Sequence, residues 1–200
     1  MELSGKNITV VGLGKTGIAL ARFLKKRGAV VIVTDMAAEE NLAPHVQELH
    51  QMDIALEAGR HRPETFQQAD LIVLSPGVPH TIAPVARARE TGTQVMGEIE
   101  LASRFIGEPI VAVTGTNGKT TTTELLGDML KRSGLDVFVG GNIGSPLIGY
   151  VDQGHRADAI VAEISSFQLD TIDRFRPQIA VLLNITIDHL DRYPNFEAYA

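Results

Sequence analysis

A glycine-rich loop between an apolar stretch and a helix-like stretch is the part of this sequence best suited to chemistry. Residues 109–133 read PIVAVTGTNGKTTTTELLGDMLKRS. Gly115 and Gly118 free the backbone to wrap around phosphates. Lys119 offers a cation to the β- and γ-phosphates, and Thr120 offers a hydroxyl to magnesium. The pattern therefore predicts a strand, a loop and a helix that bind ATP with Mg²⁺.

The spacing in this loop differs from that of the usual phosphate-binding loop. The pattern G-x-x-x-x-G-K-[ST] needs a first glycine where this chain has Val113, and the nearer glycine is Gly115. We therefore interpret TGTNGKTT as a shorter variant. The alternative is an ordinary helix start without a ligand. The run at 121–123 favours the loop, because threonine hydroxyls suit a first helical turn, where they can meet free N–H groups or a ligand.

A second glycine pattern lies near the start of the chain. Gly12, Gly14 and Gly17 form G-x-G-x-x-G between a predicted strand and a predicted helix. Such a loop lets a pyrophosphate approach backbone N–H groups, while Asp35, at the end of the next strand, can accept hydrogen bonds from hydroxyls. Gly77 follows another strand and could approach the same ligand. The pattern suits any nucleotide diphosphate; a redox dinucleotide and a turn without a ligand are the alternatives.

Two chemically capable residues follow apolar runs further along the chain. Glu163 follows AIVA and His189 follows AVLLN, so both are expected at strand ends of one sheet. The carboxylate suits Mg²⁺, which prefers oxygen ligands, whereas a lone histidine is more often structural or in contact with substrate. We interpret Asp188 and Asp191 as turn caps or as partners of Arg192.

Two amides and five histidines carry little signal by themselves. Asn142, in GGNIGSP, and Gln168, in EISSFQL, have the types and settings of turn residues. The remaining histidines have no spacing typical of a metal site, and we expect surface positions for His45, His50, His61, His80 and His155.

Apolar runs alternate with helix-like stretches along the chain, which predicts an α/β fold with parallel sheets. We expect a Rossmann-like domain over residues 1–100 and the first part of a P-loop ATPase-type α/β domain over residues 101–200. In the second domain LDVFVGG, ADAIVAEISS and QIAVLLNIT are each apolar enough for a central strand. The final residues, NFEAYA, are typical of a helix just beginning, so we expect a truncated sequence.

The composition narrows the classes of partner. The chain has 200 residues, 44% of them hydrophobic, and no cysteine, which excludes disulfides and thiolate metal sites. A net charge of -6 argues against nucleic acid or an anionic membrane as the main partner. No stretch approaches the roughly 20 apolar residues of a membrane helix, and no secretory signal is present. We expect a cytoplasmic monomer that binds small molecules.

Several longer motifs occur along the chain in a fixed order: GLGKTG, SPGVP, GEIEL, TGTNGKTT, GGNIGSP, EISSFQL and NITIDHLDRYP. Together, and across all 200 residues, they resemble the Mur ligases of bacterial cell-wall synthesis, in particular the members that add D-glutamate. The resemblance implies a three-domain ligase of peptidoglycan synthesis, with a part in cell-wall biogenesis, cell shape and cell division. ATP would phosphorylate the alanine carboxylate of UDP-N-acetylmuramoyl-L-alanine, and D-glutamate would attack the acyl phosphate, leaving ADP and phosphate.

The resemblance also implies roles for single residues. The uridine or diphosphate of the substrate would be contacted by Lys15, Thr16, Asp35 and Gly77, so that the first loop serves UDP rather than NAD. Other positions on the substrate side are Asn142, Gln168 and His189. The ATP loop would comprise Gly115, Thr116, Asn117, Gly118, Lys119, Thr120 and Thr121. The implied metal ligands are Thr120, Glu163 and His189, and the implied catalytic residues are Lys119, Glu163 and His189.

Two parts of the family pattern have no match in these residues. A carbamylated lysine that supports the metal would fall just after Ala200, and a C-terminal domain is absent. We therefore expect the segment alone to bind nucleotides without turning over. A nucleotide sensor or NAD-binding module is one alternative; a folylpolyglutamate synthase is another, but the UDP-type first domain and SSFQL argue against it.

Overall fold

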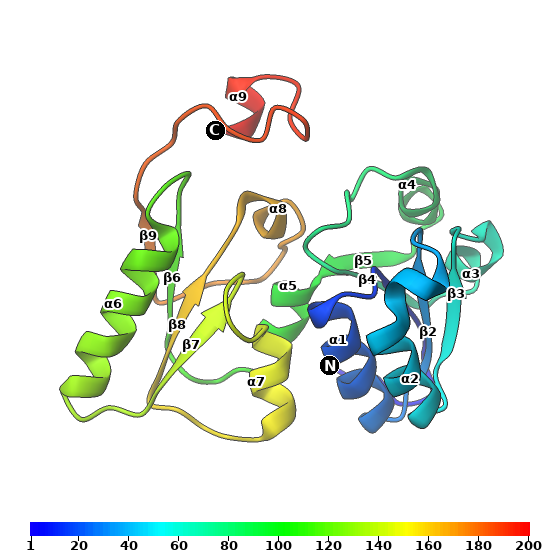
Figure 1. Ribbon diagram of the computed structural model, residues 1–200, viewed down its shortest axis with the longest axis horizontal. Coiled ribbons are helices and arrows are strands. Elements are labelled where there is room, and N and C mark those ends of the chain that lie inside the picture. Colours follow the sequence, from blue (N-terminus) through cyan, green and yellow to red (C-terminus); the bar gives the residue numbers. More distant parts are fainter.

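Short runs rich in valine, isoleucine and leucine form strands, which lie in two separate parallel sheets (Figure 1). The computed structural model describes residues 1–200. The strands of the first sheet are β1 (Asn7–Val11), β2 (Val30–Asp35), β3 (Ala55–Ala58), β4 (Leu71–Leu74) and β5 (Gln94–Gly97). Their order is β3-β2-β1-β4-β5, and every pair is parallel. The order reverses between β1 and β4, which is where open sheets of this kind bind ligands.

Helices cover both faces of the first sheet. They are α1 (Lys15–Lys26), the 3₁₀ helix η1 (Glu39–Leu42), α2 (Ala43–Gln51), α3 (Pro63–Gln67), α4 (Ala83–Glu90) and α5 (Glu98–Ser103). Side chains alternate between the faces of a strand. Val10 accordingly belongs to the same buried cluster as Phe23 of α1, whereas Val11 packs with Phe66 of α3. Covered faces on both sides explain why these strands are almost continuously apolar.

The helix ends follow local sequence signals. Prolines lie in the first turns of α2, α3 and α4, where a missing N–H breaks no hydrogen bond. Helix α1 ends with Lys25 and Lys26, cations at the negative end of its dipole, and Gly28 follows in the left-handed conformation at φ +78°. These signals were readable from the sequence, and the helix expected there is confirmed.

The second sheet is formed by residues after 109. Its strands are β6 (Ile110–Thr114), β7 (Val137–Gly141), β8 (Ala159–Glu163) and β9 (Ile179–Leu182), and its helices are α6 (Lys119–Arg132), α7 (Leu147–Gln153), α8 (Ser166–Leu169) and α9 (Phe196–Tyr199). The order is β7-β8-β6-β9, again parallel. None of the helices of the protein is both long and apolar enough to cross a membrane.

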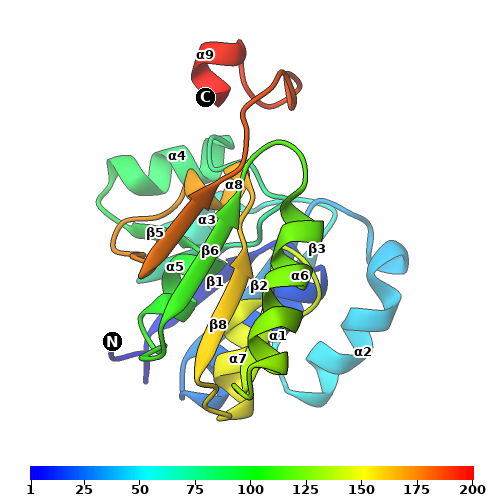
Figure 2. The ribbon, with the colours of Figure 1, turned by 90° about the vertical axis from the view of Figure 1, so that its left-hand side faces the viewer.

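The expectation of central strands is correct for one of three runs. β8 lies inside the sheet, but β7 and β9 lie at its edges, so the expectation is wrong for LDVFVGG and QIAVLLNIT. Figure 2 shows β9, β6 and β8 side by side, with α6 beside β8 rather than over β9. Ile179 and Leu182 of β9 are accordingly 56% and 60% exposed. Apolarity alone does not distinguish an inner strand from an edge strand whose faces have few neighbours.

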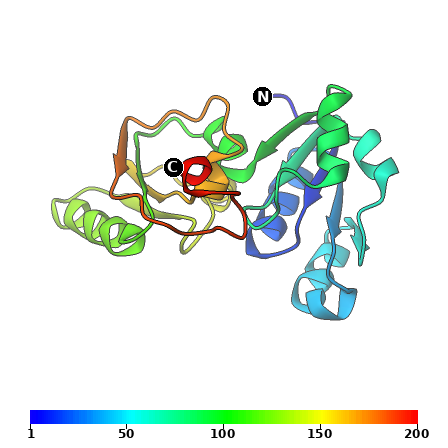
Figure 3. The same ribbon diagram turned by 90° about the horizontal axis from the view of Figure 1, so that it is seen from above.

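The two sheets share one hydrophobic core. Helices α1, α5 and α7 lie between them (Figures 1 and 3). One cluster of 32 buried residues includes Phe23 of α1, Leu101 of α5 and Ile148 of α7, and it continues to Ile160 in β8. The predicted division between residues 100 and 101 falls inside α5, so the helix that would separate the two domains also joins them. The α/β fold with parallel sheets is confirmed, and the exact division stays a prediction.

Glu100 of α5 links the two halves through a set of hydrogen bonds. One of its carboxylate oxygens accepts from the backbone N–H groups of Asp173, Arg174 and Phe175 at 2.8–2.9 Å, and the other accepts from the Arg104 guanidinium. Burial by itself would raise the pKa of Glu100, but these donors outweigh burial and lower the pKa below 4.5. A fully satisfied carboxylate thus holds the loop after α8 against α5.

Glu98, two residues earlier on α5, has fewer hydrogen bonds than Glu100. Its side chain is 1% exposed, and Oε1 accepts a hydrogen bond from the backbone N–H of Ile148 at 2.7 Å. The other oxygen, Oε2, is buried and has no hydrogen-bond partner. Burial raises the pKa of Glu98 from 4.5 to about 7, and the backbone donors of α7 offset this only in part.

Candidate functional site

The first glycine loop makes a tight turn that needs its glycines. Gly12 has φ +94°, and a Cβ at Gly17 would lie 2.0 Å from the carbonyl oxygen of Gly12. Asp35, at the end of β2, accepts hydrogen bonds from the backbone N–H groups of Leu13 at 2.7 Å and Ala37 at 2.8 Å. The Asp35 carboxylate therefore orients the loop.

A cavity of about 440 Å³ lies where the first loop meets the second sheet. Strand ends of both sheets line it: Gly12, Leu13, Gly14, Lys15, Thr16, Asp35, Ser75, Pro76, Gly77, Val78, Gly141 and Asn142. The structure thus gathers five of the predicted substrate-side residues in one cavity. Gln168 and His189 do not line it.

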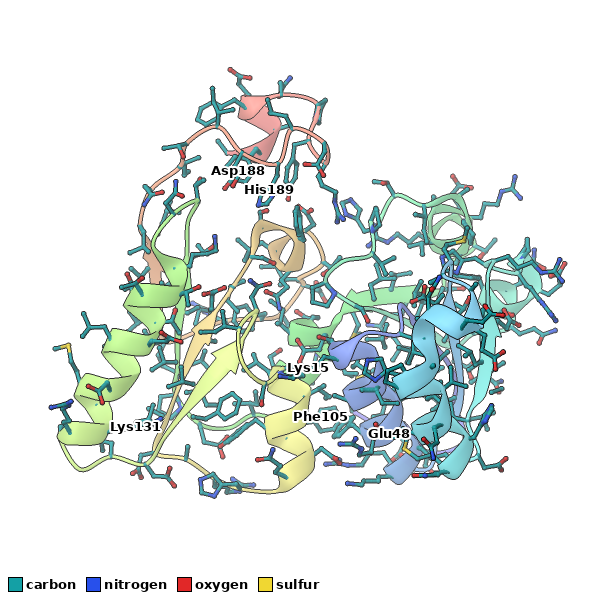
Figure 4. The ribbon with its side chains drawn as sticks, in the orientation of Figure 1. Lys15, Glu48, Phe105, Lys131, Asp188 and His189 are labelled. Carbon is teal, nitrogen blue, oxygen red and sulfur yellow. The ribbon has the colours of Figure 1, made fainter.

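Lys15 extends from the first loop to the second sheet. Its ammonium group donates a hydrogen bond to the backbone carbonyl of Gly144, in the loop after β7. Figure 4 shows Lys15 at the start of α1, on the side that faces α7. A lysine at this position can meet an anion in the cavity and also contact the second half of the molecule.

The second glycine loop is held mainly by its own backbone and by the chain after β9. The ammonium group of Lys119 donates to the carbonyl oxygens of Gly115 at 2.7 Å and Thr116 at 3.0 Å. Asn184 accepts from the N–H of Thr116 through its backbone carbonyl at 2.9 Å, and from the N–H of Asn117 through its side chain at 3.0 Å. Asn184 was not predicted as a site residue. The signal that could have identified it is its place as an amide at the end of the apolar run AVLLN.

The glycines of this loop are required by its conformation. Gly115 has φ +139° and Gly118 has φ +84°, and a Cβ on Gly115 would lie 3.0 Å from the backbone oxygen of Asn184. The short TGTNGKTT spacing therefore forms a compact loop between β6 and α6. Backbone N–H groups at the N-terminus of α6 and the Lys119 ammonium group make this loop suited to phosphate.

Glu163 connects the second glycine loop to the cavity of the first loop. It ends β8, is 2% exposed, and its Oε2 accepts a hydrogen bond from the hydroxyl of Thr120 at 2.7 Å. Its Oε1 accepts from the side-chain amide of Asn142 at 2.8 Å. Both partners are neutral hydrogen-bond donors, so neither brings a positive charge to this carboxyl group. A carboxylate and a hydroxyl side by side are hard oxygen ligands, which fits Mg²⁺.

His189 lies on the segment after β9, away from Lys15 (Figure 4). Its ring packs against Phe167 with the centroids 4.7 Å apart, and its backbone is in the left-handed region at φ +53°. The Asp188 side chain accepts from the His189 N–H at 2.8 Å, as expected for a turn cap. No group of three or more histidine, aspartate or glutamate side chains in the chain is placed to hold a metal ion. The metal role of His189 stays a prediction.

Arg192 does not contact the partners expected for it. Instead of pairing with Asp188 or Asp191, its guanidinium donates to the backbone carbonyl of Gly77 at 2.9 Å and stacks over the ring of Phe167 at 4.2 Å. The segment after β9 therefore reaches back to the loop after β4, as Figure 3 shows from above. Charge proximity in the sequence could not predict this contact between distant segments.

Gln168 has a structural role in this geometry. It is 3% exposed, and its Oε1 accepts from the backbone N–H of Ser165 at 2.9 Å and from its hydroxyl at 3.1 Å, which caps the short helix α8. Its Nε2 is buried without a partner. Contact with a substrate stays a prediction for this residue.

Three of the five histidines expected on the surface are half-buried, namely His45, His61 and His80, whereas His50 and His155 are exposed. His61 is half-buried, and its Nδ1 lies 2.9 Å from the hydroxyl of Thr34. Burial lowers the pKa of His61, although the nearby Asp35 and Glu57 act in the opposite direction. The surface expectation is therefore confirmed for His50 and His155, whereas the other three side chains are partly covered.

Two family models match the chain: the Mur ligase MurD-like N-terminal domain over residues 6–97 and the Mur ligase middle domain over residues 113–200. Curated relatives named UDP-N-acetylmuramoylalanine–D-glutamate ligase, from Desulfosudis oleivorans and Geobacter sp. strain M21, are 58% and 57% identical over 199 residues. These matches cover 100% of this chain but 43% and 44% of the relatives. The chain thus spans less than half the length of these relatives.

Solved structures of two related enzymes have a similar fold. The UDP-N-acetylmuramate:L-alanyl-γ-D-glutamyl-meso-diaminopimelate ligase of Neisseria meningitides matches with a TM-score of 0.60 at 22% identity, over 98% of this chain and 65% of that one. The UDP-N-acetylmuramate-alanine ligase of Thermotoga maritima matches with 0.56 at 23% identity, over 97% and 45%. These two likenesses show the fold. The two family models, which together match most of the chain, show that the chain belongs to the Mur ligase family.

Proposed function

We propose that the complete protein is an ATP-dependent, ADP-forming ligase that joins D-glutamate to UDP-N-acetylmuramoyl-L-alanine in peptidoglycan synthesis. The observation that carries this proposal is the position of Glu163, whose two oxygens contact Thr120 of the ATP loop and Asn142 of the neighbouring cavity. One carboxylate thus connects a phosphate-binding loop to a second anion-binding cavity. The names of relatives that are 54–58% identical over the whole chain support the choice of substrates.

The residues of the cavity would hold the UDP part of the substrate. Lys15 and the loop N–H groups bind the diphosphate, because a cation and oriented backbone donors stabilise its charge. Asp35 and Asn142 offer hydrogen-bonding groups at two sides of the same cavity. With the diphosphate held there, the alanine carboxylate at the other end of the substrate is directed towards the ATP loop.

The residues of the second loop would bind ATP and promote phosphoryl transfer. We assign the ATP contacts to Gly115, Thr116, Asn117, Gly118, Lys119, Thr120 and Thr121. Lys119 exchanges its present carbonyl partners for the γ-phosphate and stabilises charge during transfer to the alanine carboxylate. Thr120 and Glu163, with His189, would hold Mg²⁺, which supplies further neutralisation of phosphate charge. The amine of D-glutamate then attacks the acyl phosphate, and the amide and phosphate are formed.

The proposed reaction indicates where and how the protein acts. A reaction that consumes ATP and a UDP-linked sugar belongs in the cytoplasm, where these nucleotides are made and used. Its product is a precursor of the cell wall, so loss of the enzyme would affect cell shape and cell division. We further propose a monomer, with neither nucleic acid nor a membrane as a partner.

Phosphate release from ATP by the complete protein tests the proposal. We expect release only when both UDP-N-acetylmuramoyl-L-alanine and D-glutamate are present, because transfer requires the alanine carboxylate and turnover requires the amine. Release that is independent of both substrates would contradict the ligase. Tight binding of NADH without competition by UDP would instead assign the first loop to a redox dinucleotide.

A further inference from the structure

A short loop connects the surroundings of the two glycine loops. It comprises residues 141–146, from the last residue of β7 to the residue before α7, and is called the bridging loop. Its Gly144 carbonyl accepts from Lys15, and its Asn142 side chain donates to Glu163 at 2.8 Å. Glu163 also accepts a hydrogen bond from the Thr120 hydroxyl of the ATP loop. A continuous set of contacts therefore runs from the first loop through the bridging loop to the ATP loop.

The bridging loop has few contacts that would hold it by itself. Within it, the N–H of Gly141 donates to the carbonyl of Ser145 at 2.9 Å. Gly141 and Gly144 have φ +102° and +59°, and glycine adopts such conformations at a higher cost in chain entropy than other residues. The start of the loop is also held to β8, because the N–H of Asn142 donates to the backbone carbonyl of Glu163 at 2.8 Å. The position of its second half, around Gly144, therefore depends on the first turn of α7.

Glu98 fixes the first turn of α7. The first turn of α7 is buried, with Ile148 at 0% exposure, and the N–H of Ile148 donates to Glu98 Oε1 at 2.7 Å. Glu98 begins α5 directly after β5 of the first sheet. The anchor of the bridging loop thus comes from the first half of the molecule, which also carries Lys15. Both contacts fix the loop relative to the first sheet.

Stability alone does not account for a carboxylate at this position. Its Oε2 is buried without a partner, and burial of a poorly paired carboxylate costs several kcal/mol. The contact between the two halves of the molecule already includes a shared apolar core and the fully hydrogen-bonded Glu100. An apolar side chain of similar volume would join the two halves at a lower cost. What it would lack is the directional hydrogen bond to Ile148.

We propose that Glu98 is a positioning residue that holds the bridging loop in register with both glycine loops. Its effect reaches the site through Ile148 and then through Gly144, which accepts from Lys15. Without this anchor, Gly144 loses its alignment with Lys15, and the second half of the bridging loop shifts relative to the cavity. The kinetic part of this inference rests on the proposed function, whereas the anchoring of the loop does not.

Three variants of the complete protein separate positioning from stability. Glu98→Leu keeps an apolar joint but removes the acceptor. Glu98→Gln retains an acceptor for the Ile148 N–H. Glu100→Gln is the matched control, because Glu100 lies on the same helix and is equally buried but contacts residues 173–175 rather than the bridging loop.

The first measurement is kinetic. For Glu98→Leu we expect the KM for the UDP substrate to rise about tenfold, since small displacements of positioning groups have effects of this size. The KM for ATP should change by less than about threefold, because the ATP loop is held by its own carbonyls and Asn184. Glu98→Gln should restore the wild-type KM. Equal KM changes in Glu98→Leu and Glu100→Gln would overturn the positioning role.

The second measurement is amide hydrogen exchange, which requires no activity. In Glu98→Leu we expect faster exchange in residues 141–148 and unchanged exchange in β6 and α6, while Glu98→Gln keeps the wild-type pattern. Unchanged exchange of residues 141–148 in Glu98→Leu would overturn the inference. If the wild-type protein releases no phosphate with both substrates, the proposed function fails, and the exchange comparison still decides whether Glu98 anchors the loop.

Discussion

The two glycine loops have similar components but are held in different ways. Each follows the end of a parallel strand, begins a helix and has a lysine at the first helical position. Lys119 donates to two carbonyls of its own loop, whereas Lys15 donates to Gly144 in the other half of the molecule. The second glycine loop thus keeps its lysine within the loop, although Asn184 of the chain after β9 also holds its backbone. The lysine of the first loop donates to the bridging loop, so the geometry of the first loop depends on how the two halves pack together.

The largest expected effect follows from removing Lys119, the lysine of the second glycine loop. Lys119→Ala should lower kcat by about 10³-fold, because a cation that meets the transferring phosphate is lost. Unfolding temperature should stay near that of the wild type, since the ammonium group bonds only to carbonyls of a partly exposed loop. The measurement is phosphate release by the complete protein.

Lys131→Ala is the control for this change. Lys131 lies in the last turn of the same helix, at the end remote from the loop (Figure 4). We expect unchanged turnover for this variant. An equal loss of activity in both variants would show that the helix, and not the cation at its start, is responsible.

The second effect concerns Glu98, which lies at the contact between the two halves of the molecule. Burial raises the pKa of Glu98 to about 7, so the folded protein keeps this proton over a range in which the unfolded chain loses it. The stability due to Glu98 is full below pH 4.5 and is lost as the pH rises to about 7. A shift of this size corresponds to about 3 kcal/mol. Glu98→Gln should abolish this part of the pH dependence of the free energy of unfolding.

Glu100→Gln should change the same curve in the opposite direction. The pKa of Glu100 is lowered, so the stability that it contributes is present above pH 4.5 and is lost as the pH falls through its folded pKa. Denaturant titrations at a series of pH values measure both variants. Parallel curves for the wild type and Glu98→Gln between pH 4.5 and 7 would contradict the assignment.

A third effect tests the tight turn of the first loop. Gly17→Ala places a Cβ 2.0 Å from the backbone oxygen of Gly12, and backbone cannot move aside cheaply. We expect a loss of about 1–3 kcal/mol in the free energy of unfolding. At Gly14 a Cβ would meet no atom within 4 Å, so Gly14→Ala should change stability by less than about 0.5 kcal/mol. Equal losses would show that the turn is not set by this contact.

Local sequence signals predicted much of what forms within each half. The two glycine loops, the helix that begins at Lys15 and the strand ends at Asp35 and Glu163 lie where their motifs indicated. Such features depend on neighbours in the sequence, because glycine conformations, capping residues and apolar periodicity act over a few residues. The five substrate-side residues found in one cavity were predicted in another way, because Lys15, Thr16 and Asn142 were assigned by the family resemblance and not by local signals.

Contacts between distant segments could not be predicted in this way. The sequence gives no signal that Glu98 meets the N–H of Ile148, that Lys15 reaches Gly144, or that Arg192 contacts Gly77. Each of these contacts depends on how the two sheets pack around α1, α5 and α7, which local patterns do not determine. The partial cover of His61 likewise comes from a contact with a distant residue, the hydroxyl of Thr34.

The smallest expected effect sharpens the comparison between the loops most directly. Lys15→Ala removes a cation that contacts the bridging loop and lines the UDP-side cavity, but it leaves the ATP loop intact. We expect the KM for the UDP substrate to rise about five- to tenfold, equivalent to about 1 kcal/mol, with kcat changed by less than about threefold. Lys25→Ala is the matched control, because Lys25 lies on the same helix but donates to the carbonyl of Asp53 at 2.9 Å, away from the cavity. A loss of kcat in Lys15→Ala as large as that in Lys119→Ala would mean that both lysines act on the transferring phosphate, and the two loops would not differ as their hydrogen bonds indicate.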